Sequence, residues 1–284
     1  VGHLSMKTWM NCRFRRFLTV VLVCFALLLP AMSTAQLTVA QISDTHLGEP
    51  RAPQAAENLR RVVELVNARH PDIVILTGDI GENPSDWMEA KDILRGLIAP
   101  LYYVPGNHDV HSTDLARYRE MFGPDYYRFN VKNVTFIAID SQLLGNYDQY
   151  DATDPPPLSP EAQYESDKML DWLAHVAGKH RKKIVIGLQH VPIARADNFP
   201  PDAKPYWVIS EPYRSRELDL LHQLHIQHML VGHWHRGMAF ENGGIMWHVG
   251  PASSWLPWGG ELGFALHTIS KDGDVQTEFV PLAP

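Results

Sequence analysis

The feature that most restricts the fold is a run of three polar residues, Asn107-His108-Asp109, at the end of a predicted strand. Residues 101–104 are apolar, and Pro105 and Gly106 follow them, which is typical of a short buried strand that ends in a sharp turn. An amide, an imidazole and a carboxylate in succession pack poorly in a core. They suit a site that holds a hard cation beside a proton donor. Similar polar runs follow four other predicted strands, so a chance loop is a poor explanation.

Strands and helices alternate along the first part of the chain. Strands are predicted at residues 37–43, 72–77 and 101–104, with helices at 58–69 and from an N-cap at Ser85 to Ile98. This order and spacing predict a parallel sheet with right-handed crossovers. In such sheets ligands gather outside the carboxyl ends of the strands, which is where the polar runs lie.

The second part of the chain continues the alternation. Strands are predicted at 126–130, 134–140, 183–188 and 228–231, and helices at 114–122, at 161–176 and around 218–224. Residues 237–280 contain short apolar segments and glycine-rich turns, which predict a closing set of antiparallel strands. No linker divides residues 36–284, so we expect one domain there.

Metal-binding residue types occur at five predicted strand ends: Asp44 and His46; Asp79; Asn107, His108 and Asp109; His190; and His233 with His235. Each has a plain alternative taken alone, because a buried histidine often belongs to the core and an aspartate can cap a helix. The recurrence of these residue types at five strand ends favours a metal centre instead.

The first 35 residues resemble a targeting segment. Basic residues precede the apolar run 17–29, and small residues at 33–35 follow Pro30, which predicts a secretory signal peptide removed after about Ala35. We therefore expect a secreted or periplasmic protein with no stable membrane anchor after cleavage; an uncleaved anchor is the alternative.

The cysteine content restricts which metals the protein can bind, and the net charge restricts which partners it can have. Both cysteines, Cys12 and Cys24, lie in the leader, so oxygen and imidazole ligands must hold any metal, which favours Mn, Fe or Zn. Residues 36–284 contain 21 Lys and Arg against 32 Asp and Glu, a net charge of −11. This charge repels nucleic acid, and no nucleic-acid partner is expected.

In this order, Asp-x-His, Gly-Asp, Gly-Asn-His-Asp, a lone His and Gly-His-x-His resemble the motifs of the calcineurin-like metallophosphoesterase superfamily. The resemblance implies an α/β fold, an αββα sandwich with a dinuclear metal site at the carboxyl ends of the strands. It implies that one ion is held by Asp44, His46, Asp79 and His235, and that Asp79 bridges to a second held also by Asn107, His190 and His233. It also implies that His108 protonates the leaving group while Asp109 orients its ring.

The resemblance further implies a phosphoesterase, in which a hydroxide between two transition-metal ions attacks a small phosphorylated substrate or a phosphoprotein. Together with the predicted signal peptide, this leads us to expect an exported enzyme. A cyclic-nucleotide or other phosphodiesterase is an alternative, as is a catalytically silent binding protein of the same fold. Glu82 stands where purple acid phosphatases carry a tyrosine ligand, which argues against a purple iron site. Residues 189–192 and 232–236 resemble the branch that contains the calcineurin-like phosphoesterase domain-containing protein.

Other candidate residues lie outside these motifs. His222, His225 and His228 could form a third metal site, but His228 lies beyond the predicted helix end, which favours solvated histidines. Two loops adjacent to predicted ligands carry residues that could contact substrate or simply pack: Tyr206 and Trp207 in one, and Trp255, Pro257 and Trp258 in the other.

Overall fold

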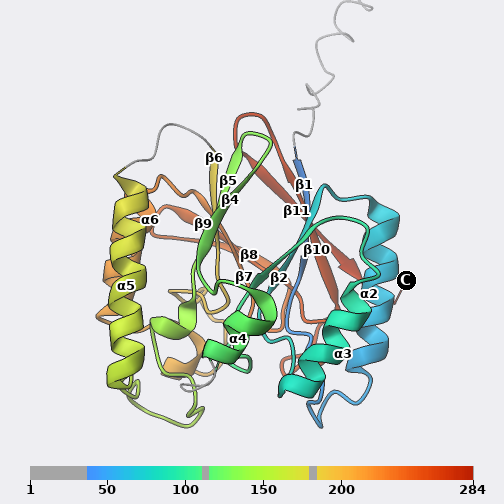
Figure 1. Cartoon of the computed structure of the whole chain (residues 1–284), viewed down its shortest axis with the longest axis horizontal. Coiled ribbons are helices and arrows are strands. Elements are labelled where there is room, and N and C mark those ends of the chain that lie inside the picture. The colour runs from blue at the N-terminus through green and yellow to red at the C-terminus, as the bar shows by residue number, and fades with distance from the viewer. Residues whose placement is uncertain (1–36, 111–114, 179–183, 284) are drawn as a thin grey trace, which may run out of the picture. The chain divides into compact units, whose positions relative to one another are not determined.

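The computed structural model describes residues 37–110, 115–178 and 184–283, which build two stacked β-sheets covered by helices (Figure 1). The first sheet has the order β11-β10-β1-β2-β3, with strands Val275–Pro281, Gly263–Ile269, Leu37–Ile42, Ile73–Thr77 and Leu101–Val104. The second has the order β4-β5-β6-β7-β9-β8, with strands Tyr127–Val131, Val134–Ala138, Ile184–Leu188, His228–Val231, Ile245–Val249 and Met238–Asn242.

Helices cover the outer face of each sheet. In Figure 1, α2 (Ala55–Arg69) and α3 (Pro84–Leu94) lie at the right, and α5 (Pro160–Ala177) and α6 (Tyr213–Gln223) at the left. The shorter helix α4 (Leu115–Phe122) adds Tyr118 to the core beneath α2 and α3. The 3₁₀ turns η1 (Ser141–Leu143) and η2 (Pro205–Trp207) lie in connecting loops. This arrangement confirms the predicted αββα sandwich.

Alternation along the strands explains why the molecule needs both layers of helices. Leu37 and Val39 of β1 pack between the sheets against residues such as Phe136, whereas Ala40 and Ile42 pack beneath α2 and α3. Because successive side chains of a strand point to opposite faces, a strand with buried residues at nearly every position needs cover on both sides. β1, β2 and β5 have this pattern.

The strand directions match most of the prediction. β1, β2 and β3 are parallel, as expected, and β10 and β11 close the first sheet as antiparallel strands. The expectation of a wholly antiparallel closing set is wrong for β9, which pairs in parallel with β7. The β8–β9 hairpin turns at Gly243 and Gly244, both at positive φ, and this reversal sets β9 in the direction of β7.

The boundaries of α2 and α3 also differ from prediction. Asn83, and not Ser85, caps α3: its side chain accepts from the backbone N–H of Ser85, and Pro84 occupies the first turn. α3 ends at Leu94, four residues before Ile98, and α2 begins at Ala55, three residues before the predicted start.

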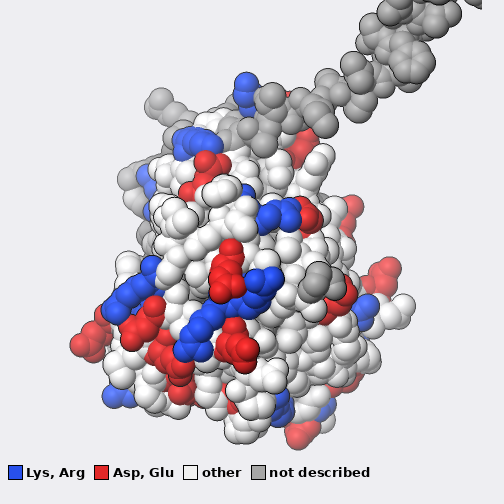
Figure 2. Space-filling model, turned by 90° about the vertical axis from the view of Figure 1, so that its right-hand side faces the viewer, with Lys and Arg blue, Asp and Glu red and all other residues white. Residues whose placement is uncertain are grey.

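The predicted leader, residues 1–35, lies outside the described residues. None of the helices in the described part of the chain has the length and apolar character needed to cross a membrane. On the face that α2 and α3 cover, basic and acidic side chains are interspersed and no large patch of one sign appears (Figure 2). Pairs such as Arg61–Glu64 and Arg95–Asp92 account for part of this mixture.

Candidate metal centre

The polar runs converge at one end of the sandwich. Asp44 and His46 follow β1, Asp79 follows β2, and Asn107 follows β3, all from the first sheet. His190 follows β6, and the segment with His233 and His235 follows β7, both from the second sheet. All seven predicted ligands are buried, with exposed fractions of 5% or less. Their assignment as ligands stays a prediction, but the fold brings them together.

The first group contains Asp44, His46, Asp79 and His235, whose candidate ligand atoms lie within 4.8 Å of one another. His46 Nε2 is 3.3 Å from Asp79 Oδ2 and 3.1 Å from His235 Nε2. His235 Nε2 is also 3.4 Å from Asp44 Oδ1. Two carboxylates and two imidazoles at this spacing are a suitable ligand set for a divalent transition metal.

The second group contains Asp79, His190 and His233. His190 Nε2 lies 3.1 Å from Asp79 Oδ2, the same oxygen that faces His46. Asp79 is therefore shared by both groups, as a carboxylate between two metal ions would be. Repulsion between two close cations requires such a bridge.

Hydrogen bonds outside the cluster leave one nitrogen of each imidazole for a metal. Three histidines use Nδ1 for these contacts. His46 Nδ1 lies 2.9 Å from Glu82 Oε1, and His190 Nδ1 lies 2.6 Å from the Thr77 carbonyl. His235 Nδ1 lies 2.9 Å from the Trp255 carbonyl. His233 uses Nε2 instead, 2.8 Å from the Tyr206 carbonyl. Acceptors of this kind fix the tautomer and ring orientation of metal-ligating histidines.

Two buried atoms provide a further test of whether these residues fit metal ions. Asn107 Oδ1 is buried without a hydrogen-bond partner, and His190 Nε2 makes no well-oriented hydrogen bond although it lies 3.1 Å from Asp79 Oδ2. The amide nitrogen of Asn107 donates to the Tyr206 hydroxyl at 3.0 Å, which keeps Oδ1 as the remaining polar atom of that side chain. Buried polar atoms without partners are costly, and coordination to a cation would satisfy both. The donor set therefore fits a pair of transition-metal ions.

Backbone strain is concentrated at the same residues. Asp44, His46, Asp79, His233 and His235 all have φ between 43° and 72°, a conformation that non-glycine residues seldom adopt. The turn after β1 is held against the turn after β2 by the backbone bonds Asp44 N–Gly78 O and His46 N–Asp79 O, 3.1 and 2.9 Å long.

The predicted turn follows Gly106, whose carbonyl accepts the backbone N–H of Asp109 at 3.1 Å, and the glycine itself is required for close packing. A Cβ atom at Gly106 would lie 2.2 Å from Asp79 Oδ1, so any side chain there would displace the shared carboxylate. Its φ is not in the left-handed region, unlike that of Gly78, where φ is 87°.

The electrostatics of the cluster centre on Asp79. Burial opposes ionisation of the imidazoles, but Asp79 raises the pKa of His46 to about 10 and that of His190 to about 9. Burial and the neighbouring imidazole of His190 lower the pKa of His233 to about 3, and burial and His46 hold the pKa of His235 well below its ordinary value. The cluster therefore attracts positive charge around Asp79 and keeps two imidazoles in the neutral form that binds metals.

The predicted orientation of His108 by Asp109 is wrong. The carboxylate of Asp109 accepts backbone N–H bonds from Ile80 and Gly106, at 2.8 and 2.9 Å, so it joins two loops and does not contact the His108 ring. His108 Nδ1 lies 2.8 Å from Glu82 Oε2. In the sequence, Glu82 stands out only as a departure from a tyrosine ligand, and no residue pattern there indicates its contact with His108.

An aromatic rim surrounds the cluster, defined here as Tyr147, Tyr206, Trp207 and Trp255. Tyr147 and Tyr206 lie 6.1 and 4.9 Å from the His233 ring, and Trp255 lies 4.8 Å from the His235 ring. Tyr206 and Trp255 also provide the carbonyls that contact these two histidines. Tyr206 and Trp255, two of the five loop residues singled out in the sequence, therefore support predicted ligands; contact of these residues with substrate stays a prediction.

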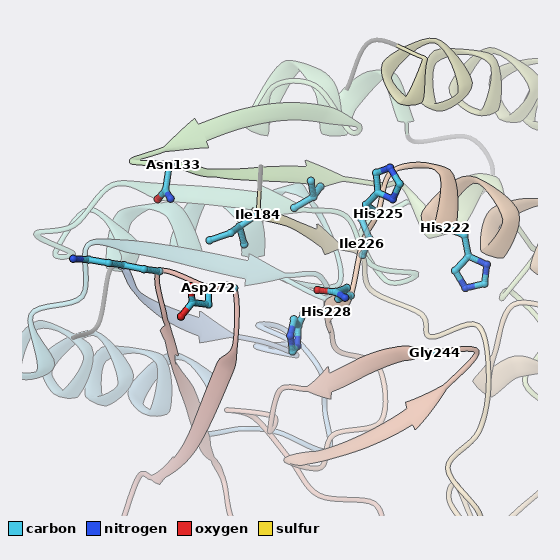
Figure 3. A pocket seen from close by; sticks show the side chains of 12 residues that line it. Asn133, Ile184, His222, His225, Ile226, His228, Gly244 and Asp272 are labelled. Atoms are coloured by element: carbon cyan, nitrogen blue, oxygen red, sulfur yellow. The ribbon is translucent and has the colours of Figure 1, made fainter. Parts of the chain in front are cut away.

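The alternative of a third metal site, which the sequence did not favour, is not formed among the described residues. His222, His225 and His228 line a pocket of about 670 Å³, and their rings lie apart in it (Figure 3). Among the described residues, they do not form a group whose ligand atoms lie within 4.8 Å of one another. The pocket is at the opposite end of the second sheet, since His228 begins β7 and Ile184 begins β6. His228 is half-buried and contacts His248 at 3.0 Å, so it is not simply solvated.

Comparisons with known proteins agree with this geometry. The chain is 27% identical over 194 residues to the bovine serine/threonine-protein phosphatase CPPED1, covering 64% of this chain and 58% of that protein. It is 24% identical over 226 residues to a probable cyclic nucleotide phosphodiesterase of Fibrobacter succinogenes, covering 74% of this chain and 77% of that protein. The matched region thus spans less than two thirds of the CPPED1 proteins.

Among solved structures, a dimetal phosphatase from Danio rerio has the same fold, with a TM-score of 0.67 and 14% identity over 88% of this chain and 97% of that one. The family described as calcineurin-like phosphoesterase matches residues 37–237, which include every predicted ligand. Family and cluster together indicate a dinuclear metal site. The chain therefore belongs to the calcineurin-like phosphoesterase family.

Proposed function

We propose that this chain is a metal-dependent hydrolase of phosphate esters. The carboxylate of Asp79 carries the proposal, because it is shared by two groups of potential ligands. Its second oxygen accepts the backbone N–H of His108 at 2.9 Å, which links the shared carboxylate to the segment of the candidate proton donor. Family membership and the dimetal phosphatase fold support the same reading.

The protein residues would divide the chemistry between them. A pair of bound Mn, Fe or Zn ions would offset charge on the phosphoryl oxygens and make water a competent nucleophile near neutral pH. His108 is half-buried beside the cluster, with its ring 4.6 Å from that of His46. It would give a proton to the departing alkoxide, a step worth about 10²–10⁴-fold in rate.

The substrate class is open between two kinds of ester. A relative named as a protein phosphatase supports a phosphomonoester or a phosphoprotein as substrate. A relative named as a probable cyclic nucleotide phosphodiesterase supports a diester. We favour a monoester, a small phosphorylated molecule or a phosphoprotein. A nucleic-acid partner is not proposed, since the net charge of −11 on residues 36–284 opposes one.

Turnover of p-nitrophenyl phosphate and of bis-p-nitrophenyl phosphate, with and without added Mn²⁺, tests the proposal. Faster turnover of the monoester would support a phosphatase, and faster turnover of the diester would support the phosphodiesterase alternative. If neither ester is hydrolysed while elemental analysis finds both ions bound, the enzyme reading fails and a binding protein on this fold is favoured.

We also propose that the chain is exported to the periplasm or the medium and loses residues 1–35. The basic start, apolar run 17–29 and small residues at 33–35 support this. Mass spectrometry of protein from an exporting host should find Gln36 as the first residue. An intact leader in the membrane fraction would favour the anchor instead.

A further inference from the structure

Glu82 contacts two histidines whose predicted roles differ. Its Oε1 lies 2.9 Å from Nδ1 of His46, a candidate metal ligand, and its Oε2 lies 2.8 Å from Nδ1 of His108, the candidate proton donor. These histidines come from different loops, after β1 and β3, and their rings meet edge to face at 4.6 Å. One carboxylate therefore joins the two loops.

Glu82 is itself held in place by backbone structure. Its N–H donates to the Leu47 carbonyl at 2.9 Å, and Leu47 and Gly81 form a parallel bridge next to the site. Asn83, which caps α3, follows it directly. The Glu82 side chain is 23% exposed, so solvent reaches it only in part. Because the backbone is held on both sides of Glu82, its side chain can set the positions of the two histidines.

The chemistry of a carboxylate determines the state of both rings. An ionised carboxylate only accepts hydrogen bonds, so Nδ1 of His46 and Nδ1 of His108 must both carry hydrogen where they meet Glu82. His46 then presents Nε2 to Asp79 and His235. Under the proposed function, Nε2 of His108 would be the atom that exchanges a proton with the substrate. Histidine ligands and general acids commonly depend on such a partner.

We propose that Glu82 is a positioning residue that sets His46 for metal binding and His108 for proton transfer at the same time. The role at His108 rests on the proposed function, whereas the role at His46 rests on ligand geometry alone. Asp109 cannot take this role, since its carboxylate is bound to backbone N–H groups of Ile80 and Gly106.

Substitution of Glu82 should therefore affect two separate measurements. Partners of this kind typically contribute 10–100-fold to metal affinity or activity. In Glu82→Ala, Mn²⁺ affinity measured by calorimetry should fall about 10–100-fold. At saturating Mn²⁺, kcat should fall further for an alkyl phosphate than for p-nitrophenyl phosphate, because a poor leaving group depends more on protonation.

The matched control is Glu89→Ala. Glu89 lies on α3, about half exposed, and contacts Arg60 rather than the site, so both measurements should match wild type. Thermal melts of the metal-free proteins identify a variant that does not fold. If Glu82→Ala does not fold, the near-isosteric Glu82→Gln replaces it, since an amide offers one acceptor atom and cannot accept from both imidazoles.

The results separate this proposal from the proposed function. Reduced Mn²⁺ affinity together with a changed ratio of kcat between the two esters would support it. Wild-type Mn²⁺ affinity would overturn it, and so would reduced affinity with an unchanged kcat ratio, because Glu82 would then serve only one histidine. If wild type hydrolyses no ester, the proposed function and the proton-transfer half of this proposal fail together, while the Mn²⁺ measurement still decides the role at His46.

Discussion

Glu217 is a buried carboxyl group whose titration should control stability. It lies on α6 facing the core, fully buried, and neither of its oxygens has a hydrogen-bond partner. Burial raises the pKa of Glu217 to about 8, and the nearby side chain of Gln189 only partly offsets this effect. The folded protein therefore holds a proton on Glu217 at pH values where the unfolded chain, with an ordinary pKa near 4.5, has released it.

The sign and size of the effect follow from this difference. Between about pH 4.5 and pH 8 the folded state binds more protons than the unfolded state, so the free energy of unfolding falls as pH rises. Each pH unit within this window costs at most about 1.4 kcal/mol. From pH 5 to pH 8 the loss attributable to Glu217 should be about 3–4 kcal/mol.

The Glu217→Gln variant isolates this contribution, because glutamine is nearly isosteric and does not titrate. Guanidinium unfolding at pH 5 and pH 8, followed by tryptophan fluorescence with EDTA present, gives the free energy of unfolding of each protein. The free energy of unfolding of Glu217→Gln minus that of wild type should be about 3–4 kcal/mol larger at pH 8 than at pH 5. Glu241→Gln on β8, where the side chain is exposed, should show no such gain. A constant difference between Glu217→Gln and wild type would mean that Glu217 is not held neutral.

Further predictions concern the metal centre. Asp79→Asn should release at least one ion, because Asp79 alone belongs to both ligand groups among the described residues; elemental analysis finding two ions at wild-type occupancy would refute the bridge. His108→Ala should keep both ions and lower kcat by about 10²–10⁴-fold, with a larger loss for an alkyl phosphate than for p-nitrophenyl phosphate. Equal losses would instead assign His108 to stabilising charge on the phosphoryl oxygens. Tyr206→Phe removes the hydroxyl that accepts from Asn107, so Mn²⁺ affinity should fall about 10-fold, and an unchanged affinity would show that the amide needs no such support.

Much of the fold could be predicted because local and global signals agree. The apolar runs that became β1, β2 and β3 are short and end in polar residues, and all three strands appear where expected. The start of α3 was placed wrongly although the signal was present, since Pro84 favours the first turn of a helix and so marks Asn83 as the cap. The direction of β9 depends on which strand its hairpin meets, and no local residue pattern specifies this.

The histidines show where sequence reasoning is weaker. His228, His248 and His267 belong to one chain of hydrogen bonds: His228 contacts His248 at 3.0 Å, and Thr277 links His248 to His267 at 2.8 and 2.9 Å. His267 in turn lies 2.9 Å from Gln41. These residues come from five strands and meet only after both sheets form, so spacing along the chain cannot reveal them.

The candidate ligands were easier to find than their arrangement for a physical reason. Residue type marks them, because aspartate, asparagine and histidine after an apolar strand are conspicuous in a sequence. Their positions depend on left-handed backbone at five residues, a conformation that costs of order 1 kcal/mol or more each and persists only where surrounding structure imposes it. Here two backbone hydrogen bonds, Asp44 N–Gly78 O and His46 N–Asp79 O, join the turns after β1 and β2 and hold the left-handed conformation in both. Glu82 belongs to the second of these turns, which is why a residue outside every recognised motif reaches both a ligand and the proton donor.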